Sequence, residues 1–124
     1  MKLFYSWQSD IPENRSFIGR CLQEAIKDVP LFEIETATRD SKGSPDIAST
    51  ILAKINDSNL FIADVTTVNH ESDAPRKYPN PNVMYELGYA VKTLGEDNII
   101  LIANKAITNT AELPFDIRNR RMIL

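Results

Sequence analysis

The chain has 124 residues, of which 43% are hydrophobic and 25% are charged. This length and composition describe one soluble globular domain and exclude a second domain of ordinary size. The formal net charge of −3 argues against a general electrostatic grip on nucleic acid, because duplex-binding proteins carry a clustered basic face. The one dense basic cluster, formed by Arg118, Arg120 and Arg121, is typical of a solvated turn or an interface patch.

Cysteine and histidine usage excludes further classes of site. The single cysteine, Cys21, rules out an internal disulfide and a multi-cysteine metal site, and its place on the apolar face of a predicted helix indicates core packing. The lone His70 has no cysteine partner with which to form a zinc site, so we expect no metal. No apolar run approaches the ~18 residues of a membrane span, and the N-terminus lacks a signal-peptide core. We therefore expect a cytoplasmic protein whose partners include neither membrane nor nucleic acid.

Strand and helix patterns alternate through the first half of the chain. Residues 3–7 predict a strand, and Asp10 with Glu13 resembles a capping pair for a helix that runs to about Asp28. The predicted buried stripe of this helix comprises Phe17, Ile18, Cys21, Leu22, Ala25 and Val29. Residues 32–38 predict a second strand, and a polar loop follows. Ser44, Pro45 and Asp46 predict a helix start, with an inward face of Ile47, Ile51, Leu52 and Ile55.

The second half continues the alternation. Residues 60–65 form an apolar run suited to the centre of a sheet, and a long polar loop covers residues 66–79. A helix is predicted from Asn80 to a C-cap at Gly95, then a strand over residues 98–103, a short turn or helix over residues 114–121, and the start of a fifth strand at residues 122–124. The apolar end of the chain indicates a domain cut from a longer protein, with a C-terminal edge strand as the alternative.

This alternation predicts an α/β fold with a parallel sheet and helices on both faces. A unit of five strands most often has the order 2-1-3-4-5, which places a ligand crevice beyond the C-terminal ends of strands 1 and 3. The residues at those ends are aromatic and polar: Tyr5, Ser6, Trp7, Gln8 and Asp64. Arg39 and Asp40, at the end of strand 2, flank the same side. Together these residues suit a nucleotide. The alternatives are that Trp7 closes the core, that Asp64 caps the next loop, and that residues 39–43 are only a connection.

The helix after the long loop carries the leading catalytic candidate, Glu86. Asn80 can cap this helix, and Pro81 fits its first turn. Glu86 lies on the border of an apolar stripe, with Asn82 one turn before it and Tyr89 nearly one turn after it. A half-desolvated carboxylate can be tuned for chemistry. The sequence contains no glycine-rich dinucleotide or Walker motif and no Gly-x-Ser-x-Gly elbow, which disfavours redox, phosphoryl-transfer and serine-hydrolase chemistry.

Three segments together resemble bacterial TIR (Toll/interleukin receptor-like) domains: FYSWQSD at residues 4–10, DVT at residues 64–66 and NPNVMYELGYA at residues 80–90. The resemblance covers essentially the whole chain and extends to the branch fused to cyclic-nucleotide sensors of the STING or SAVED type in antiphage (CBASS) defence. It implies a flavodoxin-like fold, a C-terminal sensor domain and, for many members, cleavage of NAD⁺ as a substrate, with no separate cofactor.

The resemblance also implies roles for individual residues. The family's catalytic glutamate falls on Glu86, and its ligand-facing first loop falls on residues 6–10, where Trp7 departs from many TIR sequences. The family's loop after the second strand, which contacts a neighbouring copy in head-to-tail assemblies, falls here on Asp40, Ser41, Lys42 and Gly43. In NAD⁺ cleavage, Glu86 would stabilise an oxocarbenium-like transition state. The expected substrate contacts are Tyr5, Ser6, Trp7, Arg39, Asp64, Asn82 and Tyr89.

Two other functions remain open from the sequence. The Glu86 helix is also similar to that of nucleoside 2-deoxyribosyltransferases, in which a glutamate is the nucleophile on a deoxyribosyl carbon. A non-enzymatic module that only assembles with other TIR domains is the third reading. Base exchange without action on NAD⁺ would support the transferase, and intact NAD⁺ together with concentration-dependent filaments would support the assembly module.

Overall fold

The computed structural model describes residues 1–36 and 46–124. Among these residues, five strands form one parallel sheet, and their order is β2-β1-β3-β4-β5. The predicted α/β class and the predicted strand order are both confirmed. The strands are β1 (Lys2–Ser6), β2 (Glu33–Thr36), β3 (Leu60–Asp64), β4 (Ile99–Ile102) and β5 (Met122–Ile123).

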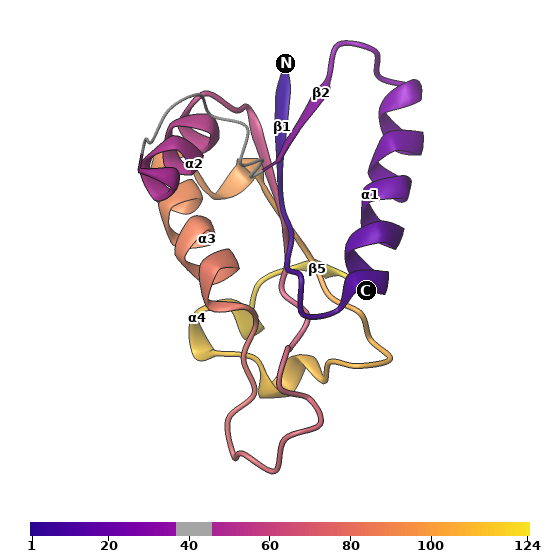
Figure 1. Ribbon diagram of the computed structural model, residues 1–124, viewed down its shortest axis with the longest axis vertical. Helices are drawn as coiled ribbons and strands as arrows, with labels where there is room; N and C mark the ends of the chain where they lie inside the picture. Colours follow the sequence, from indigo (N-terminus) through magenta and orange to yellow (C-terminus); the bar gives the residue numbers. More distant parts are fainter. Residues whose placement is uncertain (37–45) are drawn as a thin grey trace.

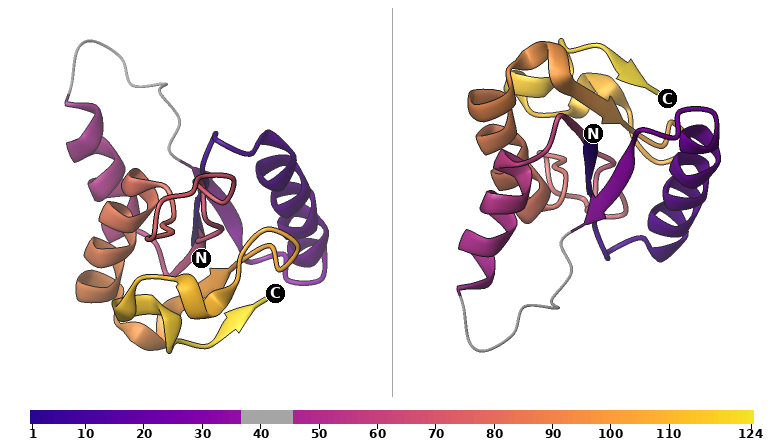
Figure 2. Two further views of the ribbon diagram at one scale, coloured as in Figure 1. Left: turned by 90° about the horizontal axis from the view of Figure 1, so that it is seen from below. Right: turned by 90° about the horizontal axis from the view of Figure 1, so that it is seen from above.

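Helices cover both faces of this sheet (Figures 1 and 2). Helix α1 (Pro12–Lys27) lies on one face, and α2 (Ile47–Asn56) and α3 (Pro81–Leu94) lie side by side on the other. The turn of α4 (Phe115–Arg118) and the 3₁₀ turns η1 (Glu96–Asn98) and η2 (Thr110–Glu112) connect the last strands. Within the described ranges, no helix combines the length and apolar character needed to cross a bilayer.

The alternation of side chains along β1 decides which groups reach which face. Phe4 points to the α2 and α3 side, where its ring stacks on that of Phe61 with 5.7 Å between centroids. Leu3 and Tyr5 point to the α1 side and pack with Ile18 and Leu22. Successive residues of a strand face opposite ways, so Ser6 points to the same side as Phe4, toward α3.

Helix α1 differs from its prediction at its start and along its buried stripe. Its N-cap is Ile11, without a side-chain capping bond, because the carboxylate of Asp10 instead accepts a hydrogen bond from Asn80 Nδ2 at 2.7 Å. Ile18 and Leu22 are buried as expected, whereas Phe17 is 62% exposed and Cys21 is exposed. The prediction of Cys21 as a core residue is therefore wrong, since only a narrow stripe of α1 meets the sheet.

Helices α2 and α3 differ in how well their starts were predicted. The side chain of Asp46 caps α2 by accepting a bond from the Ala48 amide, so the described helix begins two residues after the expected position; Ser44 and Pro45 lie outside the described residues. Helix α3 begins as predicted, because Asn80 Oδ1 accepts bonds from the amides of Asn82 and Val83. It ends at Gly95, whose φ of 83° suits a residue without Cβ.

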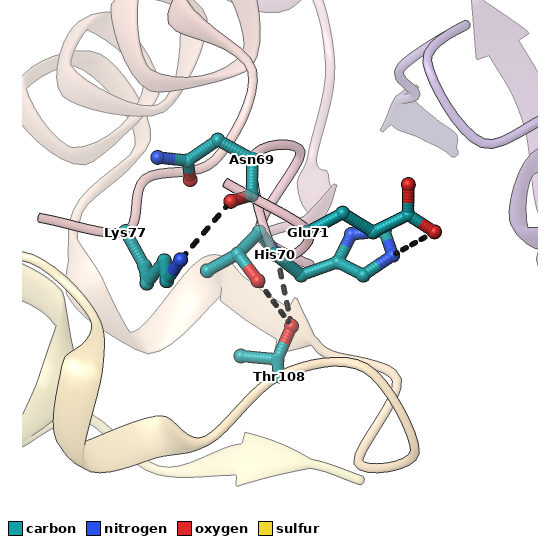
Figure 3. Close-up of polar contacts among 6 residues, drawn as sticks. Asn69, His70, Glu71, Lys77 and Thr108 are labelled. Atoms are coloured by element: carbon teal, nitrogen blue, oxygen red, sulfur yellow. Dashed lines mark hydrogen bonds and ion pairs between the residues drawn. The ribbon is translucent and has the colours of Figure 1, made fainter. Parts of the chain in front are cut away.

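The long segment of residues 66–79 is held by its own polar contacts beyond the C-terminal ends of the strands (Figure 3). Thr108 Oγ1 accepts a bond of 2.9 Å from the Thr67 amide and lies 3.2 Å from the Thr67 hydroxyl. The ammonium of Lys77 donates to the carbonyl oxygens of Asn69 and Ser72. These contacts order a segment that has no helix and only an isolated bridge between Thr67 and Pro79.

Candidate active site

Glu86 comes to the C-terminal edge of the sheet on the first turns of α3. It is only 8% exposed, and its Oε2 accepts a hydrogen bond of 2.5 Å from Ser6 Oγ at the end of β1. The two residues are 80 positions apart in the chain. Strand β1 supplies the donor because Ser6 points to the α3 side, so the fold itself builds this pair.

One oxygen of Glu86 remains free for a ligand. Within the described part of the chain, Ser6 is its only hydrogen-bond partner, and no fully buried side-chain oxygen or nitrogen lacks a partner. Oε1 therefore reaches the adjacent cleft. Burial raises the pKa of Glu86 above its ordinary value of 4.5, while the bond from Ser6 lowers it by favouring the ionised form. The result is a carboxylate that is poorly solvated and available to a positive charge.

The cleft beside Glu86 has a volume of about 420 Å³, within the usual range for small-molecule sites. Its lining combines two kinds of group. Helix α2 contributes the apolar side chains of Ile47, Ala48, Ile51 and Leu52, and the first loop and α3 contribute polar and aromatic groups from Trp7, Gln8, Ser9, Asn80, Asn82 and Tyr85. Of the described lining residues, Glu86 is the only charged one. This combination suits a ligand that carries both a flat ring and hydroxyl groups.

A bond between loops fixes the mouth of the cleft. Asn80 caps α3 with its Oδ1 and donates from Nδ2 to the carboxylate of Asp10 in the first loop. Gln8, in the same loop, is 1% exposed and accepts a bond from the Ile11 amide while donating to Asp64. The first loop and the Glu86 helix are thereby held together before any ligand arrives.

Several residues expected at the site lie elsewhere. Tyr5 is buried on the α1 face, and its hydroxyl donates to the carbonyl of Arg15 at 3.4 Å. Burial, together with the negative charge of Asp64, raises the pKa of Tyr5. Tyr89 packs against the core cluster between the sheet and the α2 and α3 helices. The structure therefore brings Ser6, Trp7, Asn82 and Glu86 together and leaves Tyr5 and Tyr89 outside the cleft.

Asp64 and the residues of the loop after β2 were also expected at the site. The carboxylate of Asp64 is fully buried and accepts bonds from Gln8, Asn14 and the Thr66 amide. It joins the first loop to the end of β3 and does not line the cleft. Arg39 and the expected oligomer contacts Asp40, Ser41, Lys42 and Gly43 lie outside the described residues. Among the described residues, no group of three or more acidic, cysteine or histidine side chains is placed to hold a metal.

Tyr85 and Ile47 are among the lining residues that were not predicted as substrate contacts from the sequence. Tyr85 is 63% exposed and Ile47 is 52% exposed, yet both line the cleft. The helical spacing of Asn82, Tyr85 and Glu86, at i, i+3 and i+4, could have indicated that they share one face. Ile47 carried no such signal, because its contact with α3 depends on how two helices pack.

Comparison with known proteins agrees with this geometry. The model of the family described as "CAP12/Pycsar effector protein, TIR domain" matches residues 8–120. The chain belongs to this family. It is a TIR domain of the bacterial antiphage effector type, so the predicted TIR family is confirmed, while the expected fused sensor domain stays a prediction. No curated protein matches this TIR domain.

A solved structure supports the fold of this TIR domain. The "2-desoxiribosyltransferase from Leishmania mexicana" is 17% identical to it, with a TM-score of 0.59. The match covers 82% of this TIR domain and 63% of the other chain. At this level of identity the likeness establishes a shared α/β architecture.

Proposed function

We propose that this TIR domain cleaves the bond between nicotinamide and ribose in NAD⁺. The observation that carries the proposal is Glu86, a nearly buried carboxylate with one oxygen free at a cleft of aromatic, apolar and amide groups. Membership of an antiphage TIR effector family supports the same reaction.

Cleavage of NAD⁺ needs little acid catalysis from the protein. As the C1′–N bond breaks, its electron pair neutralises the pyridinium ring, so nicotinamide leaves uncharged and the ribose acquires oxocarbenium character. The ionised Glu86 stabilises that positive charge, and its effect is large because the carboxylate is only 8% exposed and therefore weakly screened by solvent. Water then adds to C1′ and releases one proton, which gives ADP-ribose; addition of the substrate's own adenine nitrogen gives a cyclic product.

The remaining roles are proposed from the residues that line the cleft. We assign the planar nicotinamide ring to Tyr85 and Ile47, and the ribose hydroxyl groups to Asn82, because all three residues line the cleft. Ser6 positions the Glu86 carboxylate through its 2.5 Å bond. Trp7 borders the cleft, but one face of its ring is covered by the Arg15 guanidinium, whose Cζ lies 3.5 Å from the ring centroid. Only the other face can stack on a ligand.

The test is chromatographic detection of nicotinamide released from NAD⁺ at high protein concentration. We expect Glu86→Gln to lower the rate by ~100-fold or more, the usual effect of removing a transition-state electrostatic partner. Glu112→Gln is the matched control, because Glu112 is an exposed glutamate of η2 away from the cleft. Full activity in a folded Glu86→Gln protein would reject the proposal.

Assembly is part of the proposal. The family match supports self-association and an upstream sensor, and we infer that head-to-tail contacts between copies raise activity. Head-to-tail contacts produce filaments where the rotation between copies does not close a ring. Activity should therefore rise more steeply than in proportion to protein concentration.

A second candidate function is transfer of deoxyribose between bases. It is favoured by the absence of a phosphate-binding cation among the described lining residues, which suits a nucleoside, and by the fold shared with the Leishmania mexicana enzyme. In that reaction, Oε1 of Glu86 would attack C1′ of a deoxynucleoside, and the base would leave with the bonding electron pair and take up a proton from water. A second base would then attack C1′, displace the Glu86 carboxylate and lose a proton. Exchange of bases between deoxynucleosides, together with intact NAD⁺, would favour this reaction.

A further inference from the structure

The proposed substrate carries two phosphates, and the described lining of the Glu86 cleft has no positively charged group to bind them. None of the described residues that line the cleft is a lysine or an arginine. With a formal net charge of −3, the chain offers no general attraction for a pyrophosphate either. A cation beside the cleft would be a suitable partner for this part of the molecule.

A second hollow adjoins the cleft at Trp7. It is a groove of about 990 Å³ on the α1 side of the sheet, and Trp7 borders both this groove and the Glu86 cleft. The groove combines apolar groups, such as Phe17 and Ile34, with the side chains of Arg15 and Arg20. The groove also contains Glu24, whose carboxylate pairs with Lys27. Trp7 thus separates the Glu86 cleft, whose described lining has no cation, from a groove with two arginines.

Arg15 lies at that boundary. Its Cζ atom is 3.5 Å from the centroid of the Trp7 ring, a cation–π contact that holds the guanidinium in place. Arg15 is exposed, and within residues 1–36 and 46–124 it has no carboxylate partner. Its side-chain N–H groups are available as donors, and a guanidinium binds phosphate oxygens in a bidentate manner.

We propose that Arg15, stacked on Trp7, is the pyrophosphate-binding residue of this domain. The nicotinamide riboside half of NAD⁺ lies in the Glu86 cleft, the pyrophosphate crosses the Trp7 ring at Arg15, and the adenosine half lies in the α1 groove. This inference rests on the proposed NAD⁺ substrate. It makes Arg15 a specificity residue that separates dinucleotides from nucleosides.

The experiment measures binding without turnover, by calorimetry on the Glu86→Gln protein. The probes are NAD⁺ and nicotinamide riboside, which share the nicotinamide nucleoside and differ in the pyrophosphate and adenosine. Adding Arg15→Gln should weaken NAD⁺ binding about tenfold, which corresponds to ~1.4 kcal/mol, and leave nicotinamide riboside binding within about twofold. Arg15→Lys should restore part of the loss because it keeps the charge but not the fork of donors.

Two controls make the result specific. Arg76→Gln removes another exposed arginine, in the segment of residues 66–79, and should leave both affinities unchanged. Added salt should weaken NAD⁺ binding when Arg15 is present and have much less effect after Arg15→Gln. The thermal midpoints of the Arg15 variants show whether the fold is retained, and Arg15→Lys provides a second reading if Arg15→Gln is unstable.

The outcomes separate this inference from the proposed function. Equal losses for the two ligands, or no loss for NAD⁺, would overturn the phosphate role while leaving nicotinamide release to stand. Failure of the Glu86→Gln protein to bind NAD⁺ at all would also overturn it. Binding that depends on Arg15 in a protein that releases no nicotinamide would uphold the phosphate site and reject the glycohydrolase.

Discussion

Glu86 and Ser6 form a pair whose chemistry depends on the protonation state of the carboxylate. Burial raises the pKa of Glu86, and the hydrogen bond from Ser6 lowers it. Because the proposed reaction needs the ionised form, activity should fall as the pH decreases through this raised pKa. The acidic limb of the pH profile should therefore lie above the ordinary value of 4.5.

Ser6→Ala tests this coupling. Without the donor, the ionised form of Glu86 loses a stabilising bond, so its pKa rises further and the acidic limb of kcat/KM should move to higher pH. Ser6→Thr, which keeps a hydroxyl, should stay close to wild type. A lower rate with an unmoved limb would mean that Ser6 affects only the shape of the cleft.

At the level of single residues, the sequence predicted the site in part. Glu86 lies at the edge of the α3 stripe as expected, and Ser6 lies beside it. Tyr5 was expected at the same site although the two-residue period of β1 places it on the opposite face from Ser6. Asp64 was expected to face the ligand, but Gln8 and Asn14 already occupy its Oδ2. Such long-range hydrogen bonds leave no local signal in a sequence.

At the scale of elements, the start of α3 depends on its N-cap residue, Asn80. Asn80 caps the helix and also bonds Asp10 of the first loop. Removing a helix cap costs about 1 kcal/mol, so Asn80→Ala should lower the free energy of unfolding by about that amount or slightly more. Asn80→Ser keeps a capping oxygen and should recover most of the loss.

Urea unfolding measures both variants, and an unchanged m-value would show that the difference is one of stability. If serine were as destabilising as alanine, the bond to Asp10, rather than the cap, would be the larger contribution.

The same bond explains why one helix start was predictable and another was not. Asn80 and Pro81 specify the start of α3 through groups within three residues. The Asp10 signal was equally local, but Asn80, 70 residues away, competes for its carboxylate, and α1 begins at Pro12 without a side-chain cap. Local rules predict helix ends well only where no distant partner takes the capping group.

For the whole molecule, the alternation of apolar strands and amphipathic helices predicted a parallel sheet, because parallel strands need crossover helices. The strand order was predicted as the commonest order for a unit of five such strands. The position of the site at the C-terminal strand ends follows from the same topology. The cleft itself was not predictable, since it depends on how α2 and α3 pack against each other.

The buried carboxylate of Glu86 should lower the stability of the folded protein. Glu86 has a higher pKa in the folded state than in the unfolded chain, so between the two values the folded protein binds more protons and stability decreases as the pH rises. Glu86→Gln should therefore unfold at a higher temperature than wild type at neutral pH. The gain should vanish well below pH 4.5, where Glu86 is neutral in both the folded and the unfolded state.

Thermal unfolding of wild type, Glu86→Gln and the exposed control Glu112→Gln across that pH range measures the effect. A Glu86→Gln protein that is less stable than wild type at neutral pH would show that the carboxylate contributes more through its bond to Ser6 than it costs by burial.

Trp7 is the single tryptophan of the chain, and it borders the Glu86 cleft on one side and the α1 groove on the other. The intrinsic fluorescence of the protein therefore comes from the boundary between the two hollows. Displacement of the stacked Arg15 or entry of a ring on either side changes the surroundings of one indole. The native chain thus carries its own optical probe of occupancy, with no label attached.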